Sequence, residues 1–182
     1  MSIEVALRPA TLADAAAIAG IYAPYVADTA ISFEEVAPAP AAIVTRMTGA
    51  PRLPWLVAVN NGAIIGYAYA SPHRSRAAYR WSTDVSAYLT PSHRGQGVGT
   101  SLYRQLLTEV RTLGYISAYA GITLPNPASV RLHERVGFTR VGVFRDVGYK
   151  HGQWREVGWW QLRLADPPDN PAEPRPWTAS VR

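Results

Sequence analysis

The 182-residue sequence contains no cysteine, a single lysine and no long apolar run. Without cysteine the chain has no disulfide framework, no thiolate zinc site and no cysteine nucleophile. No stretch approaches the ~20 apolar residues that a membrane-spanning helix needs. The first residues, Met-Ser-Ile-Glu-Val, lack the basic and apolar regions of a signal peptide. We therefore expect a cytoplasmic protein with no membrane partner.

Positive charge comes almost entirely from arginine, which supplies 17 of the 18 basic residues. Apart from Arg74, Arg76 and Arg80, the arginines are scattered along the chain. A nucleic-acid-binding protein more often shows a basic stripe interleaved with aromatic residues. The guanidinium group suits phosphate, phosphinate and carboxylate ligands. The composition thus favours small anionic molecules over nucleic acid, and no cluster of histidine and carboxylate residues suggests a metal.

The order of helix and strand signals is β-α-α-β-β-β-α-β-α-β-β, which indicates one α/β domain over residues 1–164. Strands are expected over residues 3–8, 55–59, 63–70, 81–89, 116–123, 138–147 and 154–164. Helices are expected from the capping box at 11–14 to residue 27, and over 40–49, 98–114 and 126–136. From residue 165 onward, five prolines in 18 residues indicate a tail that is extended or disordered.

The segment Thr90–Tyr103 is the strongest functional signal, because an apolar strand there meets a helix through three glycines and an arginine. Arg94, Gly97 and Gly99 have the spacing Arg-x-x-Gly-x-Gly. Glycines let a ligand approach the main chain, and the helix that follows presents unpaired N–H groups to an anion. A Walker loop is excluded, since the only lysine is Lys150. The segment predicts a cradle for phosphate or pyrophosphate, and a glycine-rich helix start with nothing bound is the alternative.

A second motif follows some thirty residues later. It reads Asn126-Pro-Ala-Ser-Val-Arg-Leu-His-Glu-Arg-Val-Gly-Phe138, with an asparagine N-cap followed by proline at the first helical position. Together with the glycine loop it resembles the two coenzyme motifs of the GNAT N-acetyltransferases. The resemblance implies a mixed, twisted sheet, splayed at a bulged central strand, with helices on both faces. It also implies acetyl-CoA as the co-substrate and no metal.

The resemblance is closer to the phosphinothricin acetyltransferase branch. Ala78–Asp84 matches it, and Lys150-His-Gly-Gln-Trp-Arg-Glu-Val-Gly-Trp-Trp-Gln-Leu162 matches it most specifically. In that branch the position of Asp84 is usually a glutamate that acts as the general base for the substrate amine. Aspartate is one methylene shorter, so it must reach the amine through a water or from a shifted backbone. A carboxylate paired across strands or with an arginine is the alternative.

The resemblance assigns roles to particular residues. Acetyl-CoA is expected on Ala87, Tyr88, Leu89, Arg94, Gly95, Gln96, Gly97, Val98, Gly99, Thr100, Asn126 and Ser129. The Leu89 N–H is expected to face the thioester oxygen, and Arg74, Ser75, Arg76 and Phe33 are expected to bind the acceptor. His133, on the inward stripe of its helix, occupies a position where many members carry a tyrosine proton donor, and a packed core histidine is the alternative.

These features predict an N-acetyltransferase that moves acetyl directly from acetyl-CoA to the α-amine of a small amino-acid-like acceptor. Phosphinothricin, methionine sulfone and methionine sulfoximine are the candidate acceptors. The alternatives are a protein or peptide N-acetyltransferase and a non-catalytic acetyl-CoA-binding module. The resemblance also implies a homodimer.

Overall fold

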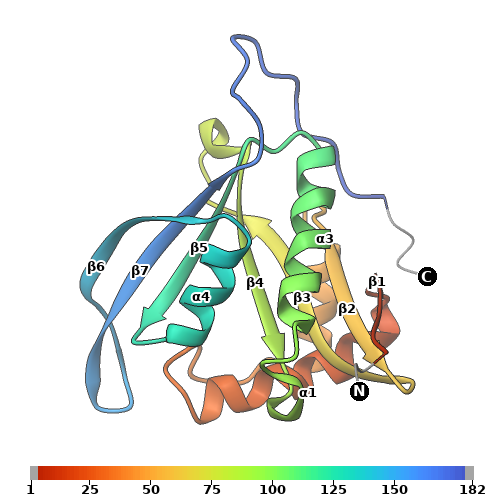
Figure 1. Cartoon of the computed structure of the whole chain (residues 1–182), viewed down its shortest axis with the longest axis vertical. Coiled ribbons are helices and arrows are strands. Elements are labelled where there is room, and N and C mark those ends of the chain that lie inside the picture. Colours follow the sequence, from red (N-terminus) through yellow and green to blue (C-terminus); the bar gives the residue numbers. More distant parts are fainter. Residues whose placement is uncertain (1–3, 179–182) are drawn as a thin grey trace.

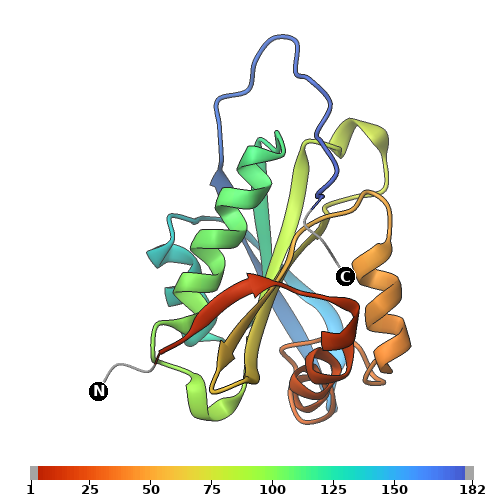
Figure 2. The ribbon, with the colours of Figure 1, turned by 90° about the vertical axis from the view of Figure 1, so that its right-hand side faces the viewer.

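The computed structural model describes residues 4–178, which form a seven-stranded mixed sheet with helices on both faces (Figures 1 and 2). The strands are β1 (Ala6–Pro9), β2 (Trp55–Asn60), β3 (Ala63–Pro72), β4 (Ser82–Leu89), β5 (Ser117–Leu124), β6 (Thr139–Lys150) and β7 (Gln153–Arg163). They lie in the order β1-β2-β3-β4-β5-β7-β6, and β4 and β5 are parallel. Ile3, expected to open the first strand, lies outside the described residues, as do residues 179–182 of the expected tail.

The helices cover the two faces in pairs, α1 and α2 on one face and α3 and α4 on the other (Figure 2). They are α1 (Ala15–Ala27), α2 (Pro40–Thr48), α3 (Val98–Thr112) and α4 (Pro127–Arg135). Three short 3-10 turns, Leu12–Asp14, Ala77–Tyr79 and Pro91–His93, lie in the connections. The expected order of elements is confirmed, because the alternating and helical patterns were long enough to be unambiguous.

Each face of the sheet has its own apolar core. On one face, Leu102, Leu106 and Val110 of α3 are fully buried against the central strands. On the other face, Ile18 and Tyr22 of α1 pack with aromatic residues of β2 and β3. Because both faces are covered, the central strands are buried on both sides and any ligand must enter at an edge or a gap of the sheet.

Two local signals formed as the sequence predicted. Asn61 and Gly62 join β2 to β3 with φ angles of 48° and 79°, the left-handed pair that a tight hairpin requires. The Asn126 side-chain oxygen accepts a hydrogen bond from the Ser129 N–H at 3.1 Å and caps α4. These caps and turns depend only on neighbouring residues, so they are predictable from the sequence.

The sheet opens between β4 and β5. Their parallel pairing covers only Ser82–Asp84 against Ser117–Tyr119, and no further β4–β5 pair forms within residues 4–178. The expected splay of the sheet at its centre is therefore present. On the other side, β4 pairs with β3 in continuous register from Thr83 to Leu89. Within residues 83–89, no register shift between β3 and β4 marks the bulge that was expected in β4.

The proline-rich segment after β7 has neither helix nor strand, yet its described part is held against the domain. It arches away from the end of β7 and returns beside α3 (Figure 1). Arg175 N–H donates to the Leu113 carbonyl at 2.8 Å, and Trp177 N–H donates to the Arg52 carbonyl at 2.9 Å. The Trp177 side chain is buried in the core on the α3 face.

Within residues 4–178, no helix combines the length and the apolar character that crossing a membrane requires.

Candidate active site

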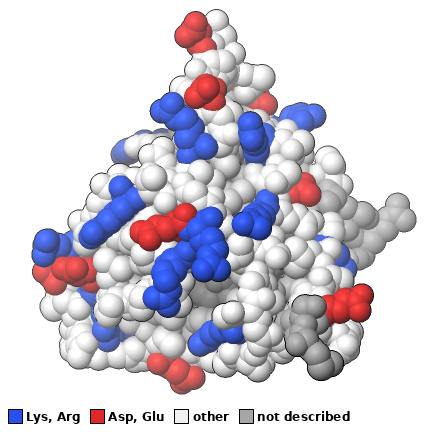
Figure 3. Space-filling model, viewed as in Figure 1, with Lys and Arg blue, Asp and Glu red and all other residues white. Residues whose placement is uncertain are grey.

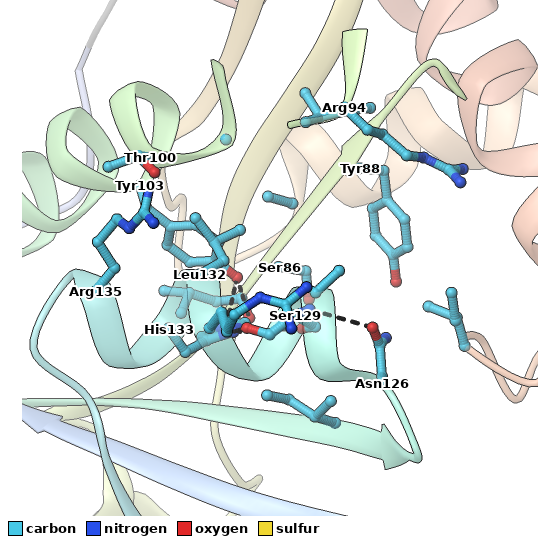
Figure 4. A pocket seen from close by; sticks show the side chains of 18 of the residues that line it. Ser86, Tyr88, Arg94, Thr100, Tyr103, Asn126, Ser129, Leu132, His133 and Arg135 are labelled. Carbon is cyan, nitrogen blue, oxygen red and sulfur yellow. Dashed lines mark hydrogen bonds between the residues drawn. The ribbon is translucent and has the colours of Figure 1, made fainter. Parts of the chain in front are cut away.

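A cavity of about 410 Å³ lies where β4 and β5 separate, beside the first turns of α3 and α4 (Figure 4). Both separated strands line it, β4 over residues 85–89 and β5 over residues 121–123. Of the residues expected to bind acetyl-CoA, the lining includes Ala87, Tyr88, Leu89, Arg94, Gly95, Gly97, Gly99, Thr100, Asn126 and Ser129. Gln96 and Val98 are not part of it: the Gln96 amide donates to the Ser92 carbonyl at 2.7 Å, and Val98 is buried in the core.

The glycine loop has the backbone that its sequence predicted. Gly95 and Gly97 have φ angles of 74° and 84°, which residues with a Cβ rarely adopt. Gly97 is the N-cap of α3, so the unpaired N–H groups of the first turn and the positive end of the helix dipole face the cavity side. This backbone is suited to an anion such as pyrophosphate.

Three arginines add positive charge to the same cavity. Arg94 comes from the glycine loop, whereas Arg131 and Arg135 come from α4. Figure 3 shows basic side chains around a hollow on this face of the molecule. Sequence reasoning missed Arg131 and Arg135, although their spacing of four residues on the capped helix places them on one face. Their guanidinium groups suit the phosphates of a nucleotide coenzyme.

His133 is buried and hydrogen-bonded at both ring nitrogens. Its Nδ1 lies 2.8 Å from the Ser129 carbonyl, so Nδ1 carries the proton. Its Nε2 then accepts from the hydroxyl of Tyr103, at 2.8 Å. Burial lowers the pKa of His133, which keeps the ring neutral. His133 therefore has no proton directed into the cavity, and the group it holds there is the Tyr103 hydroxyl.

The main chain of Leu89 lines the cavity, but its N–H is already used. That N–H donates to the Tyr25 hydroxyl at 3.2 Å, and the same hydroxyl donates to the Leu89 carbonyl at 2.6 Å. The expected role of Leu89 as an oxyanion donor therefore requires this bond to open or to be shared. Sequence reasoning did not select Tyr25, whose hydroxyl occupies both main-chain groups of Leu89.

Asp84 lies at the point where the strands part, opposite Tyr119 in the last β4–β5 pair. Its Oδ1 is 2.6 Å from Nδ1 of His73, a residue that sequence reasoning did not select. Burial raises the pKa of Asp84, and this effect outweighs the lowering by the His73 hydrogen bond and the charge of Arg74. A carboxylate with a raised pKa is a stronger proton acceptor than an ordinary aspartate.

The expected acceptor residues lie in two places. Arg74, Ser75 and Arg76 follow β3 and are exposed, and the Arg74 guanidinium lies 5.4 Å from the centre of the Trp159 ring. Phe33 lies in the α1–α2 connection and packs on β6 at Gly148, where an added Cβ would come within 2.2 Å of its ring. The Arg74 guanidinium thus lies close enough to Asp84 to act on its pKa, and the Phe33 ring packs against the β6–β7 hairpin.

The α1–α2 connection is fixed by buried polar contacts. Lys150 Nζ donates to the carbonyls of Val26, Ser32 and Glu34 at 2.6–2.8 Å. The Glu34 carboxylate also pairs with both terminal nitrogens of Arg46, and this pairing lowers the pKa of Glu34. The loop that carries Phe33 is therefore anchored to α1, α2 and the β6–β7 hairpin.

Among residues 4–178, no three histidine and carboxylate side chains come together in a way that would hold a metal ion. The site therefore combines an anion-binding loop, a gap between β4 and β5, and the Asp84 carboxylate, which is paired with His73 where these strands separate. This arrangement suits a phosphate-containing coenzyme whose arm enters the gap and meets an amine beside Asp84.

Comparisons with known proteins agree with this geometry. Residues 24–138 match the model of the acetyltransferase (GNAT) family. A phosphinothricin N-acetyltransferase of Streptomyces viridochromogenes is 40% identical over 173 residues, covering 94% of this chain and 92% of that protein. An L-methionine sulfoximine/L-methionine sulfone acetyltransferase of Salmonella typhimurium is 39% identical over 111 residues, 61% of this chain and 65% of that protein.

Among solved structures, a GNAT phosphinothricin acetyltransferase from Sinorhizobium meliloti, in complex with acetyl-CoA, superposes with a TM-score of 0.86. It is 34% identical, and the match covers 94% of this chain and 96% of that one.

Proposed function

The chain belongs to the acetyltransferase (GNAT) family and is an acetyl-CoA-dependent N-acetyltransferase, and we propose that it transfers acetyl directly to the α-amine of a free amino-acid-like acceptor. The acceptors we propose are phosphinothricin, methionine sulfone and methionine sulfoximine. The observation that carries this proposal is the position of Asp84, whose carboxylate lies where β4 and β5 begin to separate. An acceptor amine beside Asp84 would lie next to the gap between β4 and β5, where we place the thioester.

We propose that the cavity between β4 and β5 holds acetyl-CoA, which supplies the acetyl group as a thioester. The glycine loop and the first turn of α3 bind the pyrophosphate, with Arg94, Arg131 and Arg135 adding charge. The main chain of residues 87–89 pairs with the pantetheine arm as an added strand would. Asn126 and Ser129 hold the start of α4 at the cavity wall. The positive charge of the three arginines and the N-terminus of α3 fit the phosphates of this ligand.

On the acceptor side, the ammonium group must lose a proton before its nitrogen attacks the thioester carbonyl. We propose that Asp84 belongs to the base and that Arg74 binds an anionic group of the acceptor, assisted by Ser75 and Arg76. Phe33 borders the acceptor from its anchored loop. The absence of cysteine supports direct transfer, because the chain has no thiol to carry an acetyl group.

For His133 we propose a positioning role. It holds the Tyr103 hydroxyl at the cavity wall by accepting its hydrogen bond. The His133→Gln variant should bind acetyl-CoA but should turn over more slowly, with the loss in kcat rather than in the acceptor KM. An unchanged kcat together with a lower melting temperature would instead mark His133 as a core residue.

We also propose a homodimer, formed through the β6–β7 hairpin. The exposed aromatic residues of this hairpin are Phe144, Tyr149 and Trp154, and Tyr149 and Trp154 stack edge to face with their centroids 5.3 Å apart. Exposed aromatic side chains in a group are typical of protein interfaces. Light scattering should give twice the chain mass at micromolar concentration, and the Trp154→Asp variant should give the mass of one chain. A wild-type protein of single-chain mass would refute the proposal.

A thiol-release assay over free amino acids, their sulfone, sulfoximine and phosphinate analogues, and peptides tests the acceptor class. Acetylation of the analogues, with no turnover of peptides, is the expected result. Preference for peptides would instead assign the chain to protein acetylation. Tight acetyl-CoA binding without turnover of any amine would indicate a non-catalytic module.

A further inference from the structure

His73 and Asp84 form a close pair on the sheet surface away from α3. They are brought together by the β3–β4 register, in which Pro72 lies opposite Thr83. The distance from His73 Nδ1 to Asp84 Oδ1 is 2.6 Å, and the side chains are 11% and 27% exposed. The imidazole ring stacks on Tyr119, with the ring centroids 4.3 Å apart, and meets the edge of Trp159. The ring is thus held in one orientation from three sides.

This geometry fixes which nitrogen of His73 is available. An ionised carboxylate only accepts hydrogen bonds, so Nδ1 carries the proton that points to Asp84. In a neutral ring the lone pair then lies on Nε2. Within residues 4–178, Nε2 of His73 has no hydrogen-bond partner, and it is not fully buried. His73 therefore presents a free basic nitrogen, backed by a carboxylate.

We propose that His73 and Asp84 act as a catalytic dyad, in which His73 Nε2 takes the proton from the acceptor amine and Asp84 orients and stabilises the imidazolium. The proposal rests on the proposed function, because it names the base of that same site. It also accounts for the aspartate at a position where the resembling enzymes usually carry glutamate. The imidazole supplies the reach that the shorter side chain lacks.

The step balances without a further reactant. One ammonium proton moves to Nε2, and the nitrogen lone pair that this frees forms the C–N bond to the thioester carbonyl carbon. The C–S bond breaks, and its electrons leave with sulfur. The departing thiolate takes the second amine proton, giving an amide and a thiol. His73 then loses its proton to water and returns to the neutral form.

Basicity favours the dyad over a carboxylate alone. An ordinary imidazole is a stronger base than an ordinary aspartate by roughly 2.5 pKa units, and its pKa lies near neutral pH. The charged and titratable groups around the pair are Arg74, which acts on Asp84, and the hydroxyls of Tyr69, Tyr79 and Tyr119. In this set Asp84 is the one carboxylate, so it is the group that stabilises an imidazolium at His73.

Kinetics of two isosteric variants test the proposal. His73→Asn keeps an N–H for Asp84 but has no basic nitrogen, so kcat/KM should fall by roughly 10²–10³-fold. Its acidic limb should move to lower pH, because an ordinary carboxylate is a weaker base than an ordinary imidazole. The double variant His73→Asn/Asp84→Asn should have a kcat/KM within about threefold of that of the less active single variant, since the pair acts as a unit. His151→Asn and Asp146→Asn are matched controls, both exposed and at φ angles of 52° and 49°, which asparagine tolerates.

Nitrogen-15 NMR of the ligand-free protein gives a readout independent of turnover. The expected spectrum shows His73 as the neutral Nδ1–H tautomer, with a low-field proton that shifts upfield in Asp84→Asn. The Nε2–H tautomer would overturn the proposal, because Nε2 then has no lone pair for a proton. His73→Asn with wild-type kcat/KM, or with an unmoved acidic limb, would also overturn it. If the wild type acetylates none of the tested amines, the proposed function fails, whereas the NMR result still decides whether the dyad exists.

Discussion

Replacing Lys150 by methionine should loosen the loop that borders the acceptor site. Lys150 is the only lysine of the chain, and its residue is 8% exposed. Its ammonium group donates three hydrogen bonds, one to Val26 at the end of α1 and two to the loop carbonyls of Ser32 and Glu34. Methionine fills a similar volume but donates nothing, so three carbonyls lose their partner.

The magnitude follows from two opposing effects. Hydrogen bonds to a charged group contribute roughly 1.5–3 kcal/mol each, so three contribute roughly 5–9 kcal/mol. The variant no longer has to desolvate a buried ammonium group, which returns several kcal/mol. The net loss is therefore about 2–4 kcal/mol in the free energy of unfolding. For a domain of this size that corresponds to a fall in Tm of roughly 5–15 °C.

Two measurements check this expectation. Thermal unfolding should show the fall in Tm, and steady-state kinetics should show a higher KM for the acceptor, because Phe33 belongs to the loosened loop. Arg145→Met is the control, since it removes an exposed cation of the same hairpin whose ion pair with Glu156 is 3.6 Å long. The Tm of the control should change by less than about 2 °C. A Lys150→Met variant with wild-type Tm and acceptor KM would refute the reasoning.

Three further substitutions probe other parts of the structure. Gly148→Ala places a Cβ 2.2 Å from the Phe33 ring, so steady-state kinetics should show a several-fold higher acceptor KM. Asp14→Asn removes a carboxylate whose pKa the Arg8 guanidinium lowers; its Tm should be below wild type at pH 7, and the difference should shrink below about pH 4, where such a carboxylate loses its stabilising effect. Trp177→Ala should cost about 3 kcal/mol in chemical denaturation with kcat unchanged, since the buried ring packs in the core on the α3 face.

The sequence predicted what depends on neighbouring residues. The left-handed hairpin at Asn61 and Gly62, the asparagine cap of α4 and the glycine loop before α3 all formed as expected. In each case a residue type is tied to a backbone conformation by local sterics or by a hydrogen bond two to three residues away. The anion cradle is built from such elements, which is why its location was readable.

Contacts between distant segments were not readable in the same way. His73 and Asp84 are eleven residues apart and meet only because two strands pair in one particular register. Lys150 reaches carbonyls 116 to 124 residues away. Composition identifies the last segment as proline-rich, but it does not predict that the Trp177 side chain packs into the core on the α3 face. Side-chain chemistry alone does not specify which of these partners lies opposite.

Both halves of the proposed site depend on the alternation of side chains along β4. Val85, Ala87 and Leu89 pack toward α3, whereas Tyr88 packs toward α1. A slip of one residue would exchange the two sets and bring the Asp84 carboxylate to the apolar α3 side. The register against β3 prevents this, and Gly66 helps to set it, because a Cβ there would come within 2.2 Å of the Leu89 side chain. The continuous pairing of β3 with β4, with room for the Leu89 side chain at Gly66, therefore keeps the acceptor-side carboxylate and the coenzyme-side main chain in separate places on one strand.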